Sequence, residues 1–271
     1  MASDRLLAEL DPPSVIRQEG KCAKWLILCD HASNAVPTAL DGLGIADRDI
    51  ADHIGWDIGA LNVARHVAAG LDAPLYATGF SRLVIDCNRP LGSPGSIPAQ
   101  SDGRHVPGNV GLAVHERALR ERELFHPYHE AISAHLDATI SSGTIPAVIS
   151  IHSCAAVMDG VTRPWEIGIA WNRDERMSAP VMASLSKLSR LNVGANEPYT
   201  LDIGGDYTTP EHALRRGLAN LQVEFRQDCV FTEQGARNLG SLLCDAIQDA
   251  VADNWFCSAH YFDESELDGS Q

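Results

Sequence analysis

The chain has 271 residues, and 45% of them are hydrophobic, which is enough to build one large domain with a substantial core. Its formal net charge of -15 at pH 7 disfavours nucleic acid and anionic lipid as partners, because an acidic surface repels both. No apolar run approaches the roughly 20 residues of a membrane span, so we expect no membrane association. Seven cysteines without a CxxC pair, in a chain with no recognisable signal peptide, are typical of reduced thiols in a cytoplasmic protein.

Along the chain, a polar lead-in at residues 1–24 precedes a folded region at 25–256 and an acidic tail at 257–271. Strands are predicted at residues 25–29, 74–78, 82–90, 147–154, 167–171 and 221–226. Helices are predicted at residues 57–72, 112–141, 178–190, 209–212 and 233–254. Residues 91–110, rich in Gly, Pro and Ser, are predicted to form a binding loop or lid. The alternation of strands and helices along the chain predicts one α/β domain, a three-layer α/β/α sandwich around a mixed, largely parallel sheet.

Two of the predicted strands deliver a histidine to their carboxyl ends. Residues 25–29 are followed at once by Asp30 and His31, and the run that begins at Ala147 reaches His152. In open α/β sheets, ligands bind at the carboxyl ends of the strands. Because imidazole is a common zinc ligand, the pair of histidines predicts a zinc site. Either histidine alone is more often a hydrogen-bonded core residue, and it is their joint placement at two strand ends that favours a metal site.

A catalytic zinc needs about three protein ligands, so a third donor must lie near the two histidines. Asp57 is the first choice, since the helix that it opens follows the His31 strand, although an aspartate at that position is also a favoured helix N-cap. Asn34, three residues after His31, offers an amide oxygen as an alternative. Asp30 should point the other way along the strand and support the site from behind.

Glu224 lies in the middle of a predicted buried strand, between Val223 and Phe225. A carboxylate there is costly unless it is partnered or its pKa is raised. A carboxyl with a raised pKa beside a metal site suits a general base that later donates its proton. The alternative is an ion pair with a neighbouring arginine.

Several cationic and polar residues stand near predicted strand ends and could capture an anionic substrate, because guanidinium groups bind carboxylates in a bidentate manner. Ordinary salt bridges to the many acidic residues would explain them equally well. His212, at the start of a short helix, could orient substrate or cap that helix. The substrate-binding candidates are Arg82, Asn88, Arg89, Arg163, His212 and Arg226.

Seven segments, in the order in which they occur, together resemble the N-formylglutamate amidohydrolase family, and the resemblance covers residues 25–254. They are CDHASNAVP, HIGWDIGA, SRLVIDCNRP, PYH, SIHS, EHALRRGL and VEFRQD. The resemblance implies a phosphorylase/hydrolase-like fold of the zinc carboxypeptidase type, and chemistry similar to that of aspartoacylases. It implies a zinc amidohydrolase that removes an N-formyl or N-acyl group from a small acidic amino acid such as N-formyl-L-glutamate.

By this resemblance, His31 and His152 bind zinc and Glu224 is the catalytic carboxylate. Asn88 and Arg89 match a substrate-binding Asn-Arg pair of the aspartoacylases. Carboxypeptidases place a glutamate where this chain has Asn34, whereas zinc-dependent cell-wall amidases use an acid at a helix start, which favours Asp57 here. Two alternatives remain open: a zinc amidase that acts on a peptide or cell-wall amide, and a metal-binding relative without catalysis.

Overall fold

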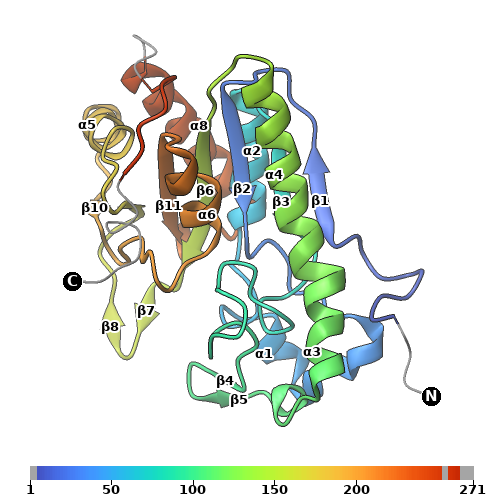
Figure 1. Ribbon diagram of the computed structural model, residues 1–271. Coiled ribbons are helices and arrows are strands. Elements are labelled where there is room, and N and C mark those ends of the chain that lie inside the picture. The colour runs from blue at the N-terminus through green and yellow to red at the C-terminus, as the bar shows by residue number, and fades with distance from the viewer. Residues whose placement is uncertain (1–4, 252–255, 263–271) are drawn as a thin grey trace.

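The computed structural model describes residues 5–251 and 256–262, and its centre is a seven-stranded sheet with helices on both faces (Figure 1). The strand order is β1-β3-β2-β6-β11-β9-β10. Strands β3, β2, β6 and β11 are mutually parallel, whereas β1 runs antiparallel to β3 and β9 antiparallel to β11. The prediction of a mixed, largely parallel sheet between two helical layers is confirmed. No helix in the described part of the chain combines the length and the apolar character needed to cross a membrane.

The sheet strands are β1 (Val15–Gln18), β2 (Trp25–Cys29), β3 (Leu75–Thr78), β6 (Ala147–Cys154), β9 (Ile167–Ala170), β10 (Val193–Ala195) and β11 (Asn220–Arg226). Two small hairpins are β4 (Gln100–Ser101) with β5 (Arg104–His105), and β7 (Val157–Met158) with β8 (Val161–Thr162). The α-helices are α1 (Asp47–Ile50), α2 (Ala60–Gly70), α3 (Val114–Arg120), α4 (His126–Ser141), α5 (Ser178–Leu188), α6 (Thr208–His212), α7 (Gln227–Val230) and α8 (Glu233–Ala250).

Alternation along β2 divides the core into two layers, because successive side chains of a strand point to opposite faces of the sheet. Ile27 and Cys29 pack with α2, α5 and α8 on one face. Leu26 and Leu28 pack on the other face with α4, which contributes Ile132 among others. Strand β2 is therefore buried on both faces, as a central strand of a parallel sheet requires.

Two segments differ from the sequence prediction. Residues 82–90 form consecutive turns and no strand, although Leu83 and Val84 are fully buried. Their apolar character reflects burial beneath a loop. The polar residues that follow form local hydrogen bonds, as when the Asn88 N–H donates to Asp86 Oδ1. The lead-in also contributes β1, an edge strand that the sequence analysis missed.

The predicted helix at 112–141 is interrupted by a π-helical turn, Glu121–Phe125, which joins α3 to α4. Pro127 stands in the first turn of α4, directly after this π-helical turn. The end of the predicted helix 233–254 and most of the predicted acidic tail, residues 263–271, lie outside the described residues.

Arg120 fixes the long loop that follows β3. The residue is 1% exposed, and its guanidinium donates to Val84 O at 2.9 Å, Gly108 O at 3.1 Å and Asn109 Oδ1 at 2.6 Å. Asn109 in turn donates to Leu83 O and Pro98 O. Because burial lowers the pKa of Arg120 only to about 10, the group stays charged at neutral pH. One side chain therefore joins the turns around residue 84 to the loop around residue 109.

A buried histidine pair joins α6 to α4. His129 Nε2 donates to Cys87 O at 2.9 Å, so its Nδ1 accepts from His212 Nε2 at 2.8 Å. The two rings stack with their centroids 5.1 Å apart. Burial lowers the pKa of His129 to about 4 and that of His212 to about 3, so both rings are neutral at pH 7.

Replacing Arg120 with Met should destabilise the fold by about 3 kcal/mol, because three buried oxygens lose a charged donor. Urea denaturation at pH 7 measures the change. Arg122→Met is the matched control on the adjacent helical turn, where an exposed ion pair with Glu123 should contribute under about 1 kcal/mol. Equal losses for the two variants would show that the Arg120 hydrogen bonds do not stabilise the loop.

The histidine pair should make stability decline on acidification. Below about pH 6.5 the unfolded chain binds protons on these rings, whereas the folded chain does not until about pH 4. The free energy of unfolding therefore falls as pH falls through this window, by up to about 1.4 kcal/mol per pH unit for each ring. Denaturation of wild type and His212→Gln at pH 7, 6 and 5 should give a shallower slope for the variant. Superimposable slopes would contradict the assignment.

Candidate metal and hydrolytic site

Three buried side chains meet at the carboxyl edge of the central strands: His31, Asp57 and His152. One donor atom from each lies within 4.8 Å of the other two. His31 follows β2 in the sequence, and His152 lies on the parallel neighbour β6. The structure thus brings together the two histidines and the acid that the sequence analysis preferred.

Asp57 is held by backbone contacts that aim its side chain inward. Its N–H donates to His31 O at 2.9 Å, and its Oδ2 accepts from Ser153 N at 3.2 Å. Helix α2 begins only at Ala60, after Gly59 with a φ of 82°, and it has no side-chain cap. A Cβ at residue 59 would lie 2.3 Å from Val230 O, so only glycine fits there. The alternative reading of Asp57 as an N-cap is therefore wrong.

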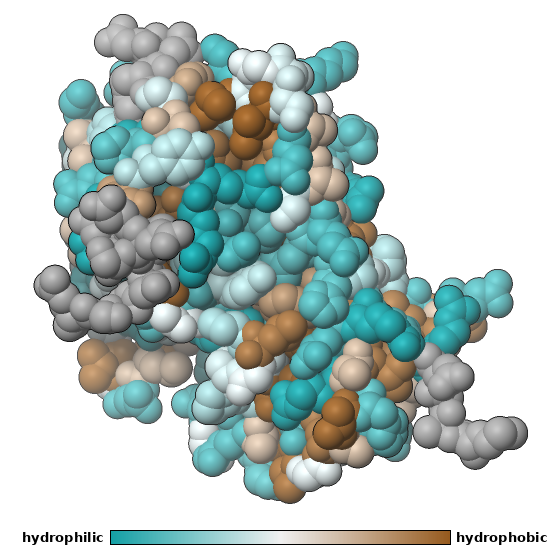
Figure 2. Space-filling view, viewed as in Figure 1, coloured by the Kyte–Doolittle hydropathy of each residue, from teal (hydrophilic) through white to brown (hydrophobic). Residues whose placement is uncertain are grey.

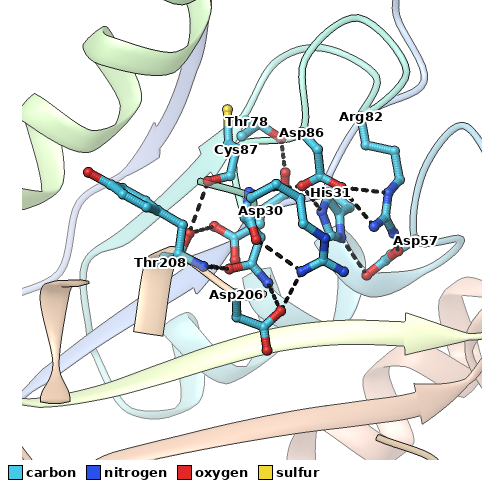
Figure 3. Close-up of polar contacts among 12 residues, drawn as sticks. Asp30, His31, Asp57, Thr78, Arg82, Asp86, Cys87, Asp206 and Thr208 are labelled. Atoms are coloured by element: carbon cyan, nitrogen blue, oxygen red, sulfur yellow. Dashed lines mark hydrogen bonds and ion pairs between the residues drawn. The ribbon is translucent and has the colours of Figure 1, made fainter. Parts of the chain in front are cut away.

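Each histidine is oriented by a carboxylate on its far nitrogen. His31 Nδ1 lies 3.3 Å from Asp57 Oδ2, and its Nε2 lies 2.8 Å from Asp86 Oδ1 (Figure 3). His152 Nδ1 lies 3.0 Å from Asp57 Oδ2, and its Nε2 faces Asp30 Oδ2 at 3.4 Å. A neutral ring that donates through Nε2 has a free Nδ1 lone pair, so both rings present a metal-binding nitrogen to one point.

Asp30 is itself held by hydrogen bonds from one residue of α4 and one residue of α6. Its Oδ1 accepts from Tyr128 OH and from Thr208 Oγ1, each at 2.8 Å. Its Oδ2 is buried and faces no donor in the described structure apart from His152, whose Nε2 also lies 3.0 Å from Ser150 Oγ. The expectation that Asp30 supports the site from behind agrees with this geometry.

The electrostatics of the cluster favour positive charge between the two rings. Burial alone would raise the pKa of Asp57, but the adjacent His31 and His152 outweigh it and hold that pKa below its usual range. Burial would lower the pKa of His152, yet hydrogen bonds to Asp30 and Asp57 raise it well above the usual value. A field that draws protons onto these rings also attracts a divalent cation. Two imidazole nitrogens and one carboxylate oxygen are a donor set that fits a metal ion.

Glu224 stands beside this cluster because β11 pairs with β6 in register, residue 224 opposite His152. Its neighbours Val223 and Phe225 point into the other layer of the core. Burial raises the pKa of Glu224 to about 7, a shift that Asp57 reinforces and His152 opposes. No arginine forms an ion pair with it in the described structure. Glu224 is thus a carboxyl that can both lose and hold a proton near neutral pH.

One cavity of about 660 Å³ contains this cluster together with four of the predicted substrate-binding residues. Figure 2 shows hydrophilic side chains gathered across the middle of the displayed face, between hydrophobic groups above and below. The four are Arg82, Asn88, Arg89 and Arg163. Arg82, Asn88 and Arg89 reach the cavity from turns, where the sequence analysis predicted a strand at 82–90, and Arg163 reaches it from the loop after β8.

Three predicted residues lie elsewhere. His212 faces His129 between α4 and α6, and Arg226 bonds to Asp228 Oδ1 at 2.7 Å; neither lines the cavity. Arg226 is the last residue of β11, and its guanidinium also contacts Glu166 Oε1 at 3.6 Å and Arg163 O at 3.1 Å. Asn34 is also outside the cavity lining.

The sequence analysis missed three residues of the cavity. Asp86 pairs with both His31 and Arg82, and only its position within a polar cluster after an apolar run hinted at a role. Asp206 and Tyr199 come from the loop before α6. Nothing in the local sequence marks them, because their partners are more than thirty residues away in the chain.

Comparison with known proteins supports one family. The sequence matches the N-formylglutamate amidohydrolase family over residues 23–231. A search of curated proteins gave no significant match. The structure is similar to that of gene product Atu2144 from Agrobacterium tumefaciens, with a TM-score of 0.87 and 32% identity, covering 92% of this chain and 99% of that one.

A second similar structure is N-formylglutamate amidohydrolase from Ralstonia eutropha JMP134. Its TM-score is 0.59 at 18% identity, covering 90% of this chain and 99% of that one, which indicates a shared fold. Because the family match spans most of the described chain and includes the histidines, the aspartate and Glu224, the chain belongs to the N-formylglutamate amidohydrolase family and is a hydrolase acting on amide bonds.

Proposed function

We propose that this protein is a zinc-dependent amidohydrolase that removes the N-formyl, or N-acyl, group from an acylated acidic amino acid such as N-formyl-L-glutamate. The observation that carries the proposal is the His31, Asp57 and His152 cluster beside Glu224, whose pKa is about 7, in one cavity. Seven cysteines, all free, support a cytoplasmic location.

His31, Asp57 and His152 would hold the metal. Zinc suits two imidazoles and a carboxylate, and when bound it supplies Lewis acidity that polarises a carbonyl and lowers the pKa of water towards about 7. Asp86 and Asp30 keep the two imidazoles oriented, each through the Nε2 atom.

Glu224 carries the proton through the reaction. As a carboxylate it takes a proton from the attacking water, and as a carboxylic acid it delivers that proton to the leaving amine nitrogen when the C–N bond breaks. A pKa near 7 keeps both forms accessible at neutral pH. Arg82, which lines the cavity with a side chain one-quarter exposed, would stabilise negative charge on the carbonyl oxygen. The products are formate, or another carboxylate, and the free amino acid.

Replacing Glu224 with Gln should leave metal content unchanged and reduce kcat/KM for N-formyl-L-glutamate by about 100-fold to 10,000-fold, because the proton carrier is lost. Formate release measures turnover, and plasma emission spectrometry measures metal. Glu130→Gln, an exposed change on α4 with the same loss of charge, should keep wild-type activity.

Near-native activity of the Glu224 variant would overturn its assigned role. Faster turnover of peptides or cell-wall fragments than of formylated amino acids would favour the amidase alternative. Bound zinc without turnover of formyl, acetyl or peptidyl substrates would identify a metal-binding relative without catalysis.

Replacing Asp57 with Ala should weaken zinc affinity by about 100-fold or more, since a charged ligand is removed. Asn34→Ala should leave zinc affinity within about threefold of wild type, because that side chain lies outside the cavity lining. Competition with a chromogenic chelator gives both affinities, and circular dichroism checks the fold. Zinc lost from the Asn34 variant but kept by the Asp57 variant would reverse the assignment of the third ligand.

A further inference from the structure

The carboxylate that orients His31 is itself held by a contact from Asn88. Asp86 Oδ1 lies 2.8 Å from His31 Nε2, and the same oxygen accepts the backbone N–H of Asn88 at 2.9 Å. The other oxygen, Oδ2, accepts from Arg82 Nε at 3.1 Å and from Arg82 Nη2 at 2.8 Å. Both oxygens are therefore fixed from the turns at residues 82–90, and the oxygen that meets His31 is shared with Asn88.

The carboxylate behind His152 is held by two hydroxyl groups. Asp30 Oδ1 accepts from Tyr128 OH on α4 and from Thr208 Oγ1 on α6, each at 2.8 Å. These bonds leave Asp30 Oδ2 facing His152 Nε2 at 3.4 Å, while Ser150 Oγ lies 3.0 Å from the same nitrogen and competes for its proton. The alignment of the ring with Asp30 therefore depends on the two hydroxyl groups.

One side chain joins these two arrangements. Asn88 Oδ1 accepts the backbone N–H of Tyr207 at 3.1 Å and that of Thr208 at 3.0 Å. Helix α6 begins at Thr208 without a cap from its own N-cap side chain, so Asn88 satisfies N–H groups that helix starts leave without an intrahelical partner. Asn88 thus fixes the start of α6, from which Thr208 reaches Asp30 (Figure 3).

The connection is shielded from solvent. Thr208, Asp30 and Asn88 are all buried. Hydrogen bonds in a medium of low dielectric are electrostatically stronger than in water, and a polar group left unpaired there is correspondingly costly. Because little water reaches Thr208 or Asp30, solvent does not readily replace the bond between them. A displacement at the start of α6 is therefore passed on to Asp30.

The nitrogen of the Asn88 amide has a different environment from its oxygen. Nδ2 donates to Asp206 Oδ1 at 3.1 Å. Since an amide nitrogen carries two N–H groups, this bond does not exclude the substrate contact that the resemblance to aspartoacylases implies. Substrate binding would use Nδ2, whereas the contact with α6 uses Oδ1. The two roles are therefore separable by measuring metal affinity and KM independently.

We propose that Asn88 and Thr208 are positioning residues of the metal site. Together they fix the two carboxylates behind the metal-binding histidines, and through them they set the affinity of the site for its metal. This proposal rests on the zinc-dependent function proposed above and adds to it two residues that are not metal ligands. Removing an outer partner of a metal-binding histidine typically costs 10-fold to 100-fold in metal affinity, which sets the scale of the expected effects.

Thr208→Val removes the hydroxyl that bonds to Asp30 and keeps both the shape of the side chain and the backbone N–H. The Kd for zinc should rise about tenfold, at the low end of that scale because Tyr128 still holds Asp30. Thr208→Ser restores the hydroxyl and should return the Kd to within about threefold of wild type. Competition with a chromogenic chelator gives each Kd.

Thr209→Val is the matched control on the same helix. Thr209 is also buried, but its Oγ1 bonds to Gln222 Oε1 at 3.4 Å. Each valine variant loses one buried hydroxyl, so urea denaturation should show similar losses of stability, whereas only the Thr208 variant should bind zinc more weakly. Wild-type zinc affinity in the Thr208 variant, or an equal loss of affinity in both variants, would overturn the role of Thr208.

Asn88→Ala separates the two roles of the asparagine. If Oδ1 fixes α6, the Kd for zinc should rise about 10-fold to 100-fold, and the visible absorption of the cobalt-substituted protein should change with the ligand geometry. An asparagine that only binds substrate would instead raise KM and leave the zinc Kd and the cobalt spectrum at their wild-type values, which would overturn its positioning role. Circular dichroism checks the fold, and the Thr208 variants test the same connection by a smaller change.

The same measurements separate this proposal from the proposed function. If wild type binds zinc but hydrolyses no formyl, acetyl or peptidyl amino acid, and Thr208→Val still weakens zinc binding, the hydrolase proposal fails and the positioning role stands. If wild type hydrolyses N-formyl-L-glutamate while Thr208→Val and Asn88→Ala bind zinc as tightly as wild type, the positioning role fails and the hydrolase proposal stands. A wild-type chain that binds no zinc would overturn both.

Discussion

The site depends on one carboxylate oxygen. Asp57 Oδ2 faces Nδ1 of both His31 and His152 and also accepts the backbone N–H of Ser153. These contacts join the turn before α2 to two adjacent parallel strands. The orientation of both rings, and therefore of any cation between them, follows from where this oxygen is held.

The surrounding carboxylates are arranged around this oxygen of Asp57. Asp30 and Asp86 hold the far nitrogens of the two rings, and Arg82 neutralises Asp86 from outside. Four acidic groups in one buried region are costly unless positive charge compensates them, because desolvation penalises each ionised form. Two imidazoles and one guanidinium supply part of that compensation, and the raised pKa of Glu224 supplies the rest by leaving one group partly protonated.

The sequence was enough to predict the features that depend on periodicity and on strand ends. Two apolar runs that finish in histidine placed His31 and His152 at the same sheet edge, because parallel neighbours align their carboxyl ends. Because successive side chains of a strand point to opposite faces of the sheet, Glu224 was expected on the face opposite to Val223 and Phe225. These features are local, and the physical rules that govern them act within about ten residues.

Features that depend on distant pairing were not predictable in the same way. The run at 82–90 has strand composition, but Leu83 and Val84 are buried beneath a loop that Arg120 and Asn109 fasten. The partnership of Arg89 with Asp206 joins positions 117 residues apart. An arginine near a strand end therefore indicates a ligand-binding group only after its protein partners are known. Arg89 Nη1 contacts Asp206 Oδ1, whereas Arg163 donates to Ala155 O and the Tyr199 hydroxyl, and neither set of partners can be deduced from the local sequence.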